Sequence, residues 1–493
     1  MKFNRSAGIL LHPTSLTGPY GIGDLGPTAF EWLDWLAESG CKLWQVLPLG
    51  PTSYGDSPYQ CFSAFAGNPY MISPDILLEQ GLLKQEDLAD MPAWDDQRVD
   101  FGRLYLWKPA LLERAFQHFS SATGPVKAEF DSFCAENAGW LDDYALFMAI
   151  KETYDGGAWD LWPKALRLRE TTAMQEARRT LAGLVVRFSF YQFLFFRQWK
   201  NVLEYAHEKG VQIIGDIPIF VAFDSSDVWA HPDLFYLDKD GNPTVVAGVP
   251  PDYFSPTGQL WGNPLYKWEV HKASGYAWWL ERIRATLKLV DILRIDHFRG
   301  FAGYWEIPAG NPTAEIGCWV PGPAADFFNA VQANLGSLPI LAEDLGVITP
   351  DVVALREQFD LPGMKILQFA FSGPDNPFLP HSYPKNCAVY TGTHDNDTTR
   401  GWYERAPEIE KDFARRYLQI DGSQIAWDLI QHAWNSVAVF SLAPLQDFLE
   451  LGTAARMNYP SKLGGNWEWR MNGEALSDGL QKRIKEMNWL YQR

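Results

Sequence analysis

Short apolar runs that end in polar residues recur along the chain and limit its fold more than any other feature. Eight of these runs have the length of strands, and helical patterns lie between many of them. Eight strands that alternate with helices predict an α/β fold, the (β/α)8 or TIM barrel of parallel strands. The expected strands are residues 8–11, 42–47, 211–214, 290–295, 339–342, 365–369, 388–393 and 437–442.

The helical patterns between these runs have recognisable ends. Residues 27–39 carry one apolar face and stop at Gly40, and residues 187–209 form a long aromatic-rich helix that stops at Gly210. A helix is also expected over residues 276–289. Thr349 is a suitable N-cap for one that runs to residue 359.

Two connections are too long to be simple loops. Residues 51–186 contain helical patterns and are expected to form an inserted, mainly helical subdomain. Residues 217–270 are rich in proline, glycine and aromatics and are expected to form an inserted substrate lid. Both leave the carboxyl ends of strands, where barrels build active sites. We therefore expect residues 1–493 to form one catalytic barrel. The roughly 50 residues after the eighth expected strand leave no room for a separate all-β C-terminal domain.

Charge and composition exclude several classes of partner. A net charge of −18 disfavours nucleic acid and anionic membranes, which both attract basic surfaces. Aromatic residues make up 15% of the chain and suit the apolar faces of neutral sugars. No apolar run reaches the roughly 18 residues of a membrane helix. The N-terminal apolar run, residues 7–11, is too short for a signal peptide, so a cytoplasmic protein is expected.

Acidic residues fall at the ends of four different expected strands: Asp216, Asp296, Glu343 and Asp395. In a closed barrel these carboxyl groups would converge on one rim. Glycoside chemistry requires such a set, because one ionised carboxylate attacks the anomeric carbon while a protonated one expels the leaving oxygen. A further negative charge stabilises the cationic transition state.

Basic residues accompany these acids. Arg294 lies two residues before Asp296, so both point to the same side of a strand, and its guanidinium is expected to lower the pKa of Asp296. His297, His394 and Arg299 add donors for sugar hydroxyls.

The acids by themselves leave other functions open. Clusters of Asp, Glu and His also bind metals, as in metal-dependent barrel lyases. A single strand-end acid such as Asp344 is more often a loop or capping residue than a catalyst. A non-catalytic carbohydrate-binding protein is a further alternative. The five cysteines are scattered without a metal-binding spacing and are expected to be free thiols.

Longer motifs around the acids are more specific. Residues 294–300 (RIDHFRG), 342–346 (AEDLG), 393–396 (THDN) and 215–220 (GDIPIF) resemble the motifs of the 4-α-glucanotransferases called amylomaltases or disproportionating enzymes, glycoside hydrolase family 77. The resemblance continues, in order, at residues 12–16, 56–59, 250–254, 259–264 and 465–467. Thr17 departs from the family pattern, which usually has proline there.

The resemblance implies a retaining double displacement between α-1,4-glucans. Asp296 would be the nucleophile, Glu343 the acid/base and Asp395 the transition-state stabiliser. The expected substrates are maltooligosaccharide, amylose or starch-type glucan, with no cofactor and no metal. A hydrolase with the same site stays an alternative, and the protein could be a monomer or a homodimer. The residues expected to position the glucan are Tyr59, Asp216, Asp252, Gln259, Trp261, Arg294, His297, His394 and Asn466.

Overall fold

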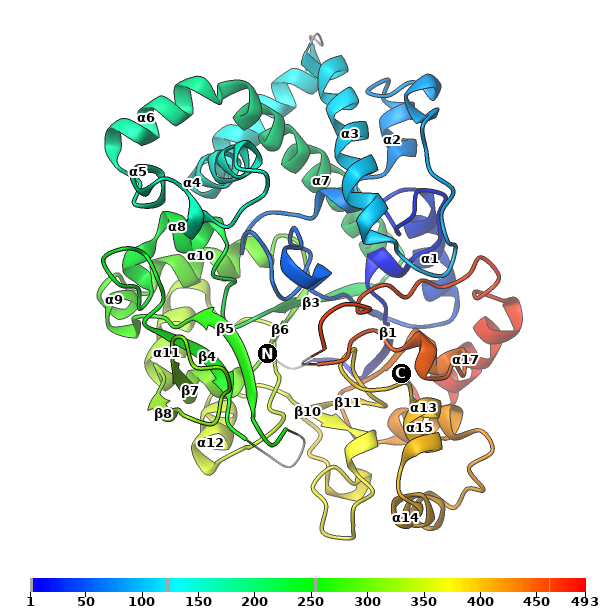
Figure 1. The fold of residues 1–493 in the computed structure, drawn as a ribbon. Helices are drawn as coiled ribbons and strands as arrows, with labels where there is room; N and C mark the ends of the chain where they lie inside the picture. Colours follow the sequence, from blue (N-terminus) through cyan, green and yellow to red (C-terminus); the bar gives the residue numbers. More distant parts are fainter. Residues whose placement is uncertain (1–2, 121–123, 252–254, 461) are drawn as a thin grey trace.

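The computed structural model describes residues 3–120, 124–251, 255–460 and 462–493. Within these ranges, eight parallel strands form one sheet in the order β10-β11-β12-β1-β2-β3-β6-β9 (Figure 1). The edge strands meet where the Ala342 N–H donates to the Pro362 carbonyl over 2.9 Å, which closes the barrel. Its strands are β1 (Ser6–Leu10), β2 (Leu43–Gln45), β3 (Gln212–Ile217), β6 (Ile292–Ile295), β9 (Ile340–Ala342), β10 (Gly363–Ile366), β11 (Cys387–Tyr390) and β12 (Phe440–Pro444).

The interior of the barrel is a packed core rather than a pore. Large apolar side chains from different strands of the sheet, such as Leu43, Ile214 and Leu341, are fully buried in one cluster. Tyr390 joins them and donates its hydroxyl to Gln45 Oε1 over 2.8 Å, so the one polar atom of its side chain is satisfied. This core supports the carboxyl ends of the strands from below.

The predicted (β/α)8 barrel is confirmed, and the differences lie at the strand ends. β3 runs three residues further than expected, so Asp216 lies within the strand and pairs in register with Arg294 of β6. β12 begins later than expected, at Phe440. The apolar residue Val437 suggested an earlier start, but its side chain is exposed and does not belong to the core.

Helices surround the barrel and cover its outer face (Figure 1). Pro27 opens α1 and Gly40 follows it with φ 78°, as the sequence predicted. Thr349 takes the N-cap position of α12, although its side chain makes no capping hydrogen bond to the backbone. The barrel helices are α1 (Pro27–Glu38), α7 (Ala182–Glu208), α9 (Trp268–Ala273), α10 (Ala277–Thr286), α11 (Ala324–Leu335), α12 (Pro350–Gln358), α13 (Thr399–Arg405), α14 (Glu408–Leu418), α15 (Ile425–Asn435), α16 (Leu445–Phe448) and α17 (Asp478–Leu490).

Residues 51–186 are mainly helical and lie beside α7, above the barrel in the view of Figure 1. Aromatic side chains join the two parts, as where Phe130 of α4 meets Phe193 of α7 with ring centroids 5.8 Å apart. That these residues form a separate subdomain stays a prediction. The helices are α2 (Pro74–Glu79), α3 (Phe101–Ser120), α4 (Pro125–Thr153), α5 (Lys164–Arg167) and α6 (Thr171–Thr180), while α8 (Ser226–Ala230) belongs to the second long connection.

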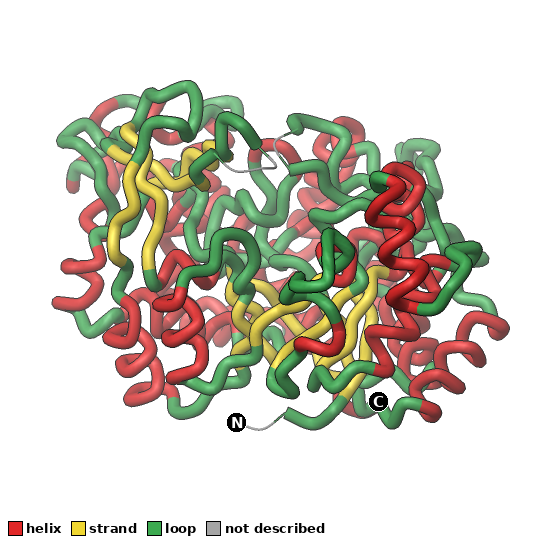
Figure 2. Tube along the Cα trace, turned by 90° about the horizontal axis from the view of Figure 1, so that it is seen from below, coloured by secondary structure: helices red, strands yellow, loops and turns green. Residues whose placement is uncertain are grey.

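A second, antiparallel sheet was not predicted. It has the order β5-β4-β7-β8 and combines two strands from residues 217–270 with two that follow β6. Figure 2 shows these strands set apart from the barrel strands, at one side of the molecule. The sheet consists of two neighbouring pairs, β4 with β5 and β7 with β8, which are joined by the long-range pairing of β4 with β7. The strands are short, and their residues fall between the expected barrel strands, in the connections of the barrel. They are β4 (Val245–Val249), β5 (Gln259–Pro264), β7 (Gly303–Pro308) and β8 (Cys318–Pro321).

After β12, the described residues 445–460 and 462–493 hold α16, α17 and loops, without an all-β domain. In the described part of the chain, no helix combines the length and the apolar character needed to cross a membrane.

Candidate active site

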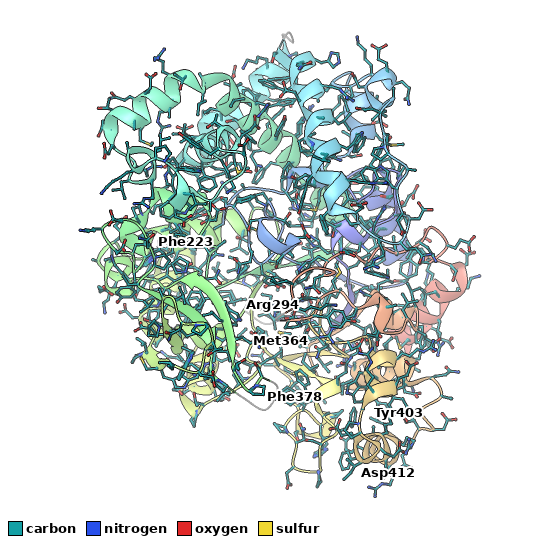
Figure 3. All side chains as sticks on the ribbon, viewed as in Figure 1. Phe223, Arg294, Met364, Phe378, Tyr403 and Asp412 are labelled. Atoms are coloured by element: carbon teal, nitrogen blue, oxygen red, sulfur yellow. The ribbon has the colours of Figure 1, made fainter. Side chains whose placement is uncertain are left out.

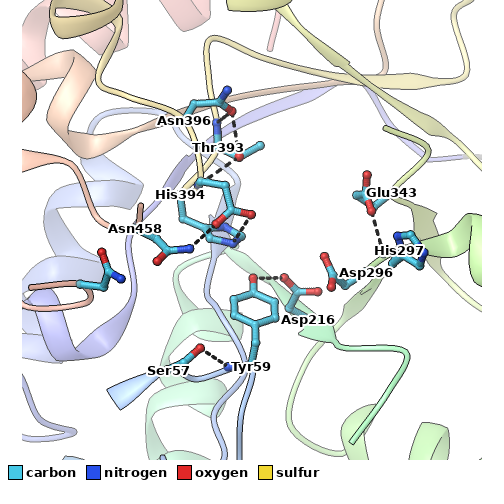
Figure 4. A network of polar contacts seen from close by, with 12 residues as sticks. Ser57, Tyr59, Asp216, Asp296, His297, Glu343, Thr393, His394, Asn396 and Asn458 are labelled. Atoms are coloured by element: carbon cyan, nitrogen blue, oxygen red, sulfur yellow. Dashed lines mark hydrogen bonds and ion pairs between the residues drawn. The ribbon is translucent and has the colours of Figure 1, made fainter. Parts of the chain in front are cut away.

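The four strand-end acids meet at the mouth of the barrel, as expected. Asp216 belongs to β3, Asp296 follows β6, Glu343 follows β9 and Asp395 lies five residues beyond β11. Figure 4 shows Asp216, Asp296 and Glu343 with their side chains directed toward one region, and His394 beside them. Parallel strands bring their carboxyl ends to one edge, so residues distant in the sequence share a site.

Arg294 is the cation at the centre of this site. Its side chain is 4% exposed and lies deep among other side chains near the middle of the molecule (Figure 3). One guanidinium nitrogen contacts Asp216, whose side chain is fully buried, and Nη2 lies 3.0 Å from Asp296 Oδ1. Tyr59 donates its hydroxyl to Asp216 Oδ2 over 2.7 Å. Two carboxylates therefore share one buried guanidinium.

Asp296 has a higher pKa than the sequence suggested. We expected Arg294 to lower it, but burial raises it more strongly than Arg294 lowers it, and Asp216 and Asp395 raise it further. The result is a pKa of about 6. The predicted effect of Arg294 is present, but the net pKa is raised because the sequence showed the cation and not the depth of the site. At neutral pH the carboxyl group is still predominantly ionised.

The pKa of Glu343 is shifted further from its usual value than that of Asp296. Its side chain is buried, and burial followed by the negative charge of Asp296 raises its pKa to about 8. The backbone N–H groups of His297 and Leu345 donate to its two carboxyl oxygens over 2.7 and 2.8 Å. His297 adopts a left-handed conformation (φ 50°, ψ 48°), which is uncommon for a residue other than glycine, at the turn where its N–H meets Glu343.

The two groups therefore differ in protonation near neutral pH. Asp296 ionises first, and its charge helps to keep the proton on Glu343. Carboxyl groups whose environments push their pKa values apart are the usual arrangement of a nucleophile and a general acid.

Asp395 is the most acidic of the set. Burial raises its pKa, but the charge and contact of His394 and a hydrogen bond from Asn458 outweigh burial and lower it to about 2. Asn458 Nδ2 donates to Asp395 Oδ1 over 2.6 Å, and His394 Nε2 lies 3.4 Å from Oδ2. The Asp395 side chain is 48% exposed, so an ionised carboxylate faces the open side of the mouth.

Aromatic rings line two sides of the acids. Tyr59 stacks on His394, with ring centroids 5.0 Å apart and planes at 18°, and Trp467 lies 5.8 Å from both. On the other side, Trp261 of β5 meets the ring of His297 edge-on at 4.8 Å. Burial, followed by the charge of Arg299, lowers the pKa of His297 to about 3, so its ring is neutral.

The other expected binding residues have different environments. Gln259 accepts the indole N–H of Trp261 over 3.1 Å, so both predicted residues of β5 lie together. Asn466 instead binds its own loop: Oδ1 accepts the Tyr459 N–H over 2.9 Å and Nδ2 donates to the Lys462 carbonyl over 2.8 Å. Asp252 lies outside the described residues.

Asp344 and Asn458 lie near the site but differ in what their side chains contact. Asp344 pairs with Arg356 and accepts the Met364 N–H over 2.6 Å, so its carboxylate serves the fold, in line with its interpretation as a loop residue. Sequence reasoning missed Asn458, whose contact with Asp395 spans 63 residues and has no local signature.

Among the described residues, no group of three or more His, Cys, Asp or Glu side chains is arranged to hold a metal ion. Arg294 already supplies a cation to Asp216 and Asp296, so the arrangement disfavours a metal at that point.

A parallel barrel that carries a pair of carboxyl groups with separated pKa values, a third ionised acid and flanking aromatic rings belongs to the class of carbohydrate-processing (β/α)8 barrels. Residues 11–477 match the model of the family described as 4-alpha-glucanotransferase, glycoside hydrolase family 77. The chain belongs to this family, whose known reaction is the transfer of glucan segments.

Individual relatives cover the whole chain. It is 52% identical over 497 residues to the 4-alpha-glucanotransferase of Thermus thermophilus, across 99% of both proteins. It is 49% identical over 499 residues to that of Synechocystis sp., across 100% of this chain and 99% of the relative. Among solved structures, the amylomaltase from Streptococcus agalactiae in complex with acarbose superposes with a TM-score of 0.96 at 40% identity, across 99% of both chains.

Proposed function

We propose that the protein transfers α-1,4-glucan segments from a donor to the 4-hydroxyl of an acceptor, with Asp296 as nucleophile, Glu343 as acid/base and Asp395 as transition-state stabiliser. The observation that carries this assignment is the divergent protonation of Asp296 and Glu343 around a shared buried arginine. An ionised nucleophile beside a protonated acid is the resting state that a retaining reaction needs.

In the first step, Asp296 attacks C1 of the donor sugar. The bond from C1 to the glycosidic oxygen breaks, and this oxygen takes the proton of Glu343 and leaves as the 4-hydroxyl of the departing segment. The donor segment stays attached to Asp296 as an ester. Once the ester has formed, the negative charge of Asp296 is gone, which favours the ionised form of Glu343.

In the second step, Glu343 removes the proton from the 4-hydroxyl of an acceptor, whose oxygen attacks C1 and releases Asp296. The acceptor takes the place that water has in a hydrolase. Asp395, which is ionised through this range of pH, stabilises the positive charge that develops on the sugar ring in both steps.

The surrounding residues suit a neutral glucan. We assign the positioning of the sugar to Tyr59, His297, His394, Gln259 and Trp261. The neutral ring of His297 can donate to or accept from hydroxyls without introducing a charge. Asp216 and Arg294 act from beneath by orienting Tyr59 and Asp296. Direct roles for Asp252 and Asn466 remain proposals that the family resemblance supports.

Incubation with maltotriose tests transfer against hydrolysis. We expect a ladder of longer oligomers together with glucose, because each transfer lengthens one molecule and shortens another. Shortening without longer products would identify a hydrolase, and no turnover would identify a binding protein. Activity that disappears in excess chelator would point instead to a metal-dependent enzyme.

A further inference from the structure

We propose that Asn458 is a positioning residue that fixes the carboxylate of Asp395 for the transition state. This inference rests on the proposed role of Asp395 as stabiliser. Asn458 belongs to the loop after β12, far from the motif that contains Asp395, and none of the motifs that identify the family includes it.

The segment 456–458 holds residues 394 and 395 at three points. Arg456 donates from Nη2 to the Asp395 carbonyl over 2.6 Å, and the Asn458 N–H donates to the His394 carbonyl over 3.1 Å. The Asn458 side chain then donates to Asp395 Oδ1 over 2.6 Å (Figure 4). One short segment thus holds both the main chain of residues 394 and 395 and the side chain of Asp395.

Asp395 needs such support because its own loop supplies one long contact, from His394, to its side chain. The carboxylate is 48% exposed, and residues 393–396 offer it one side-chain contact, from His394 Nε2 to Oδ2 at 3.4 Å. Their other contact is to the Asp395 backbone, whose N–H donates to Thr393 Oγ1 over 3.3 Å. A half-exposed Asp without a fixed partner samples several rotamers. A carboxylate stabilises a transition state most when it is already in place.

The two carboxylate oxygens of Asp395 have different partners. Oδ1 accepts the short hydrogen bond from Asn458. Oδ2 makes the longer contact with His394 Nε2, at 3.4 Å, and as a carboxylate oxygen it retains capacity to accept hydroxyls of the sugar as well. Asn458 holds one oxygen so that the other is presented to the substrate.

The described residues next to Asn458 are themselves held in place. The Trp467 N–H donates to the Met457 carbonyl over 2.7 Å, directly before Asn458. Arg456 donates from Nε to the Asn458 carbonyl over 2.7 Å, and its guanidinium lies over the ring of Tyr459 at 4.3 Å. The position of the Asn458 amide is therefore set before substrate arrives.

A neutral amide suits this position better than a carboxylate. The charged groups that act on Asp395 are His394 and Arg294, and Asp296 lies close enough for its own pKa to be raised by Asp395. A second carboxylate in place of the amide would lie within hydrogen-bond distance of Asp395 and would favour sharing of a proton between the two.

The test compares Asn458→Ala and Asn458→Asp with a matched control, Asn386→Asp. Asn386 also donates from its side-chain nitrogen to an aspartate, Asp360, over 3.1 Å, at the amino-terminal side of β11, away from the site. With maltotriose, we expect Asn458→Ala to lower kcat by about tenfold or more with KM changed less than about twofold. The control should keep the kinetics of the unsubstituted protein.

The pH profile separates positioning from a general structural role. In Asn458→Asp, a second carboxyl group titrates beside Asp395, so the acid limb of kcat/KM should become steeper and move to higher pH, while Asn386→Asp leaves it in place. Circular dichroism melts of both Asn458 variants identify any loss of folding. If folded Asn458 variants keep the kcat and acid limb of the unsubstituted protein, the positioning role is wrong. If the unsubstituted protein itself forms no ladder from maltotriose, the proposed function fails instead.

Discussion

Arg294 Nη2 lies 3.0 Å from Asp296 Oδ1, and the opposite side of the same guanidinium contacts Asp216. Asp216 and Arg294 are also register partners on β3 and β6, so the strand pairing itself sets this contact. The arginine lowers the pKa of Asp296 against the stronger effect of burial. It thereby keeps the nucleophile mostly ionised at neutral pH while leaving Glu343 protonated.

We predict that Arg294→Lys moves the acid limb of kcat/KM to higher pH. A single ammonium cannot contact both carboxylates as the planar guanidinium does, so Asp296 loses part of the interaction that lowers its pKa. At neutral pH we expect kcat to fall by about 100-fold. The exposed pair of Arg98 with Glu468 provides the control, because Arg98→Lys should leave the profile unchanged. An unshifted acid limb in Arg294→Lys would contradict the role assigned to the guanidinium.

Asp296→Asn should lower turnover of maltotriose by at least about a thousandfold. The amide is nearly the same size as the carboxylate but cannot form the ester intermediate. Release of glucose measures the rate, and Asp421→Asn, on an exposed loop, controls for the chemistry of the substitution. A variant that retains more than a few per cent of the rate would show that the nucleophile is another group.

The pH–rate profile of the unsubstituted protein should be bell-shaped. Activity requires ionised Asp296, so it should rise through a pKa of about 6, and it requires protonated Glu343, so it should fall through a pKa of about 8. In Glu343→Gln the residual activity should lose the basic limb. Measurement of kcat/KM between pH 4.5 and 9.5 checks both limbs, and an intact basic limb in Glu343→Gln would assign it to a different residue.

Glu343 should also make the fold less stable as pH rises. Its pKa is higher in the folded state than in the unfolded chain, so its contribution to stability is present below the unfolded pKa. That contribution is lost as the pH rises toward the folded pKa of about 8, by up to about 1.4 kcal/mol per pH unit. Glu343→Gln removes this loss.

Thermal melts at pH 5, 7 and 8.5 measure this effect. The melting temperature of Glu343→Gln relative to the unsubstituted protein should increase steadily across the series. A difference that stays constant with pH would mean that Glu343 is not held in its protonated form by the fold.

Several features of the site were predictable because they are encoded locally. Each acid follows or ends an apolar run, and parallel strands must bring such ends to one edge. The spacing of Arg294 in β6 and Asp296 directly after it likewise predicted that both side chains point to the same side, as their 3.0 Å contact confirms. The family motifs surround these same positions, so the sequence identified the acids without the fold.

Other features could not be predicted because they arise between distant segments. The antiparallel sheet pairs β4 with β7, from two different connections of the barrel. Asn466 fits a binding motif in the sequence, yet its amide is occupied by backbone groups of its own loop. Asn458 could not be recognised as a site residue from the sequence, because its role depends entirely on its contact with the distant Asp395.

The eight barrel strands, the helices between many of them and the acids at the mouth could be read from the amino-acid sequence alone, because hydrophobic periodicity and strand-end placement are properties of consecutive residues. The protonation states of these acids are a property of the folded barrel. Whether Asp296 or Glu343 holds a proton depends on burial and on neighbours contributed by other strands, so the pKa values of about 6 and about 8 exist only after the barrel has closed around Arg294.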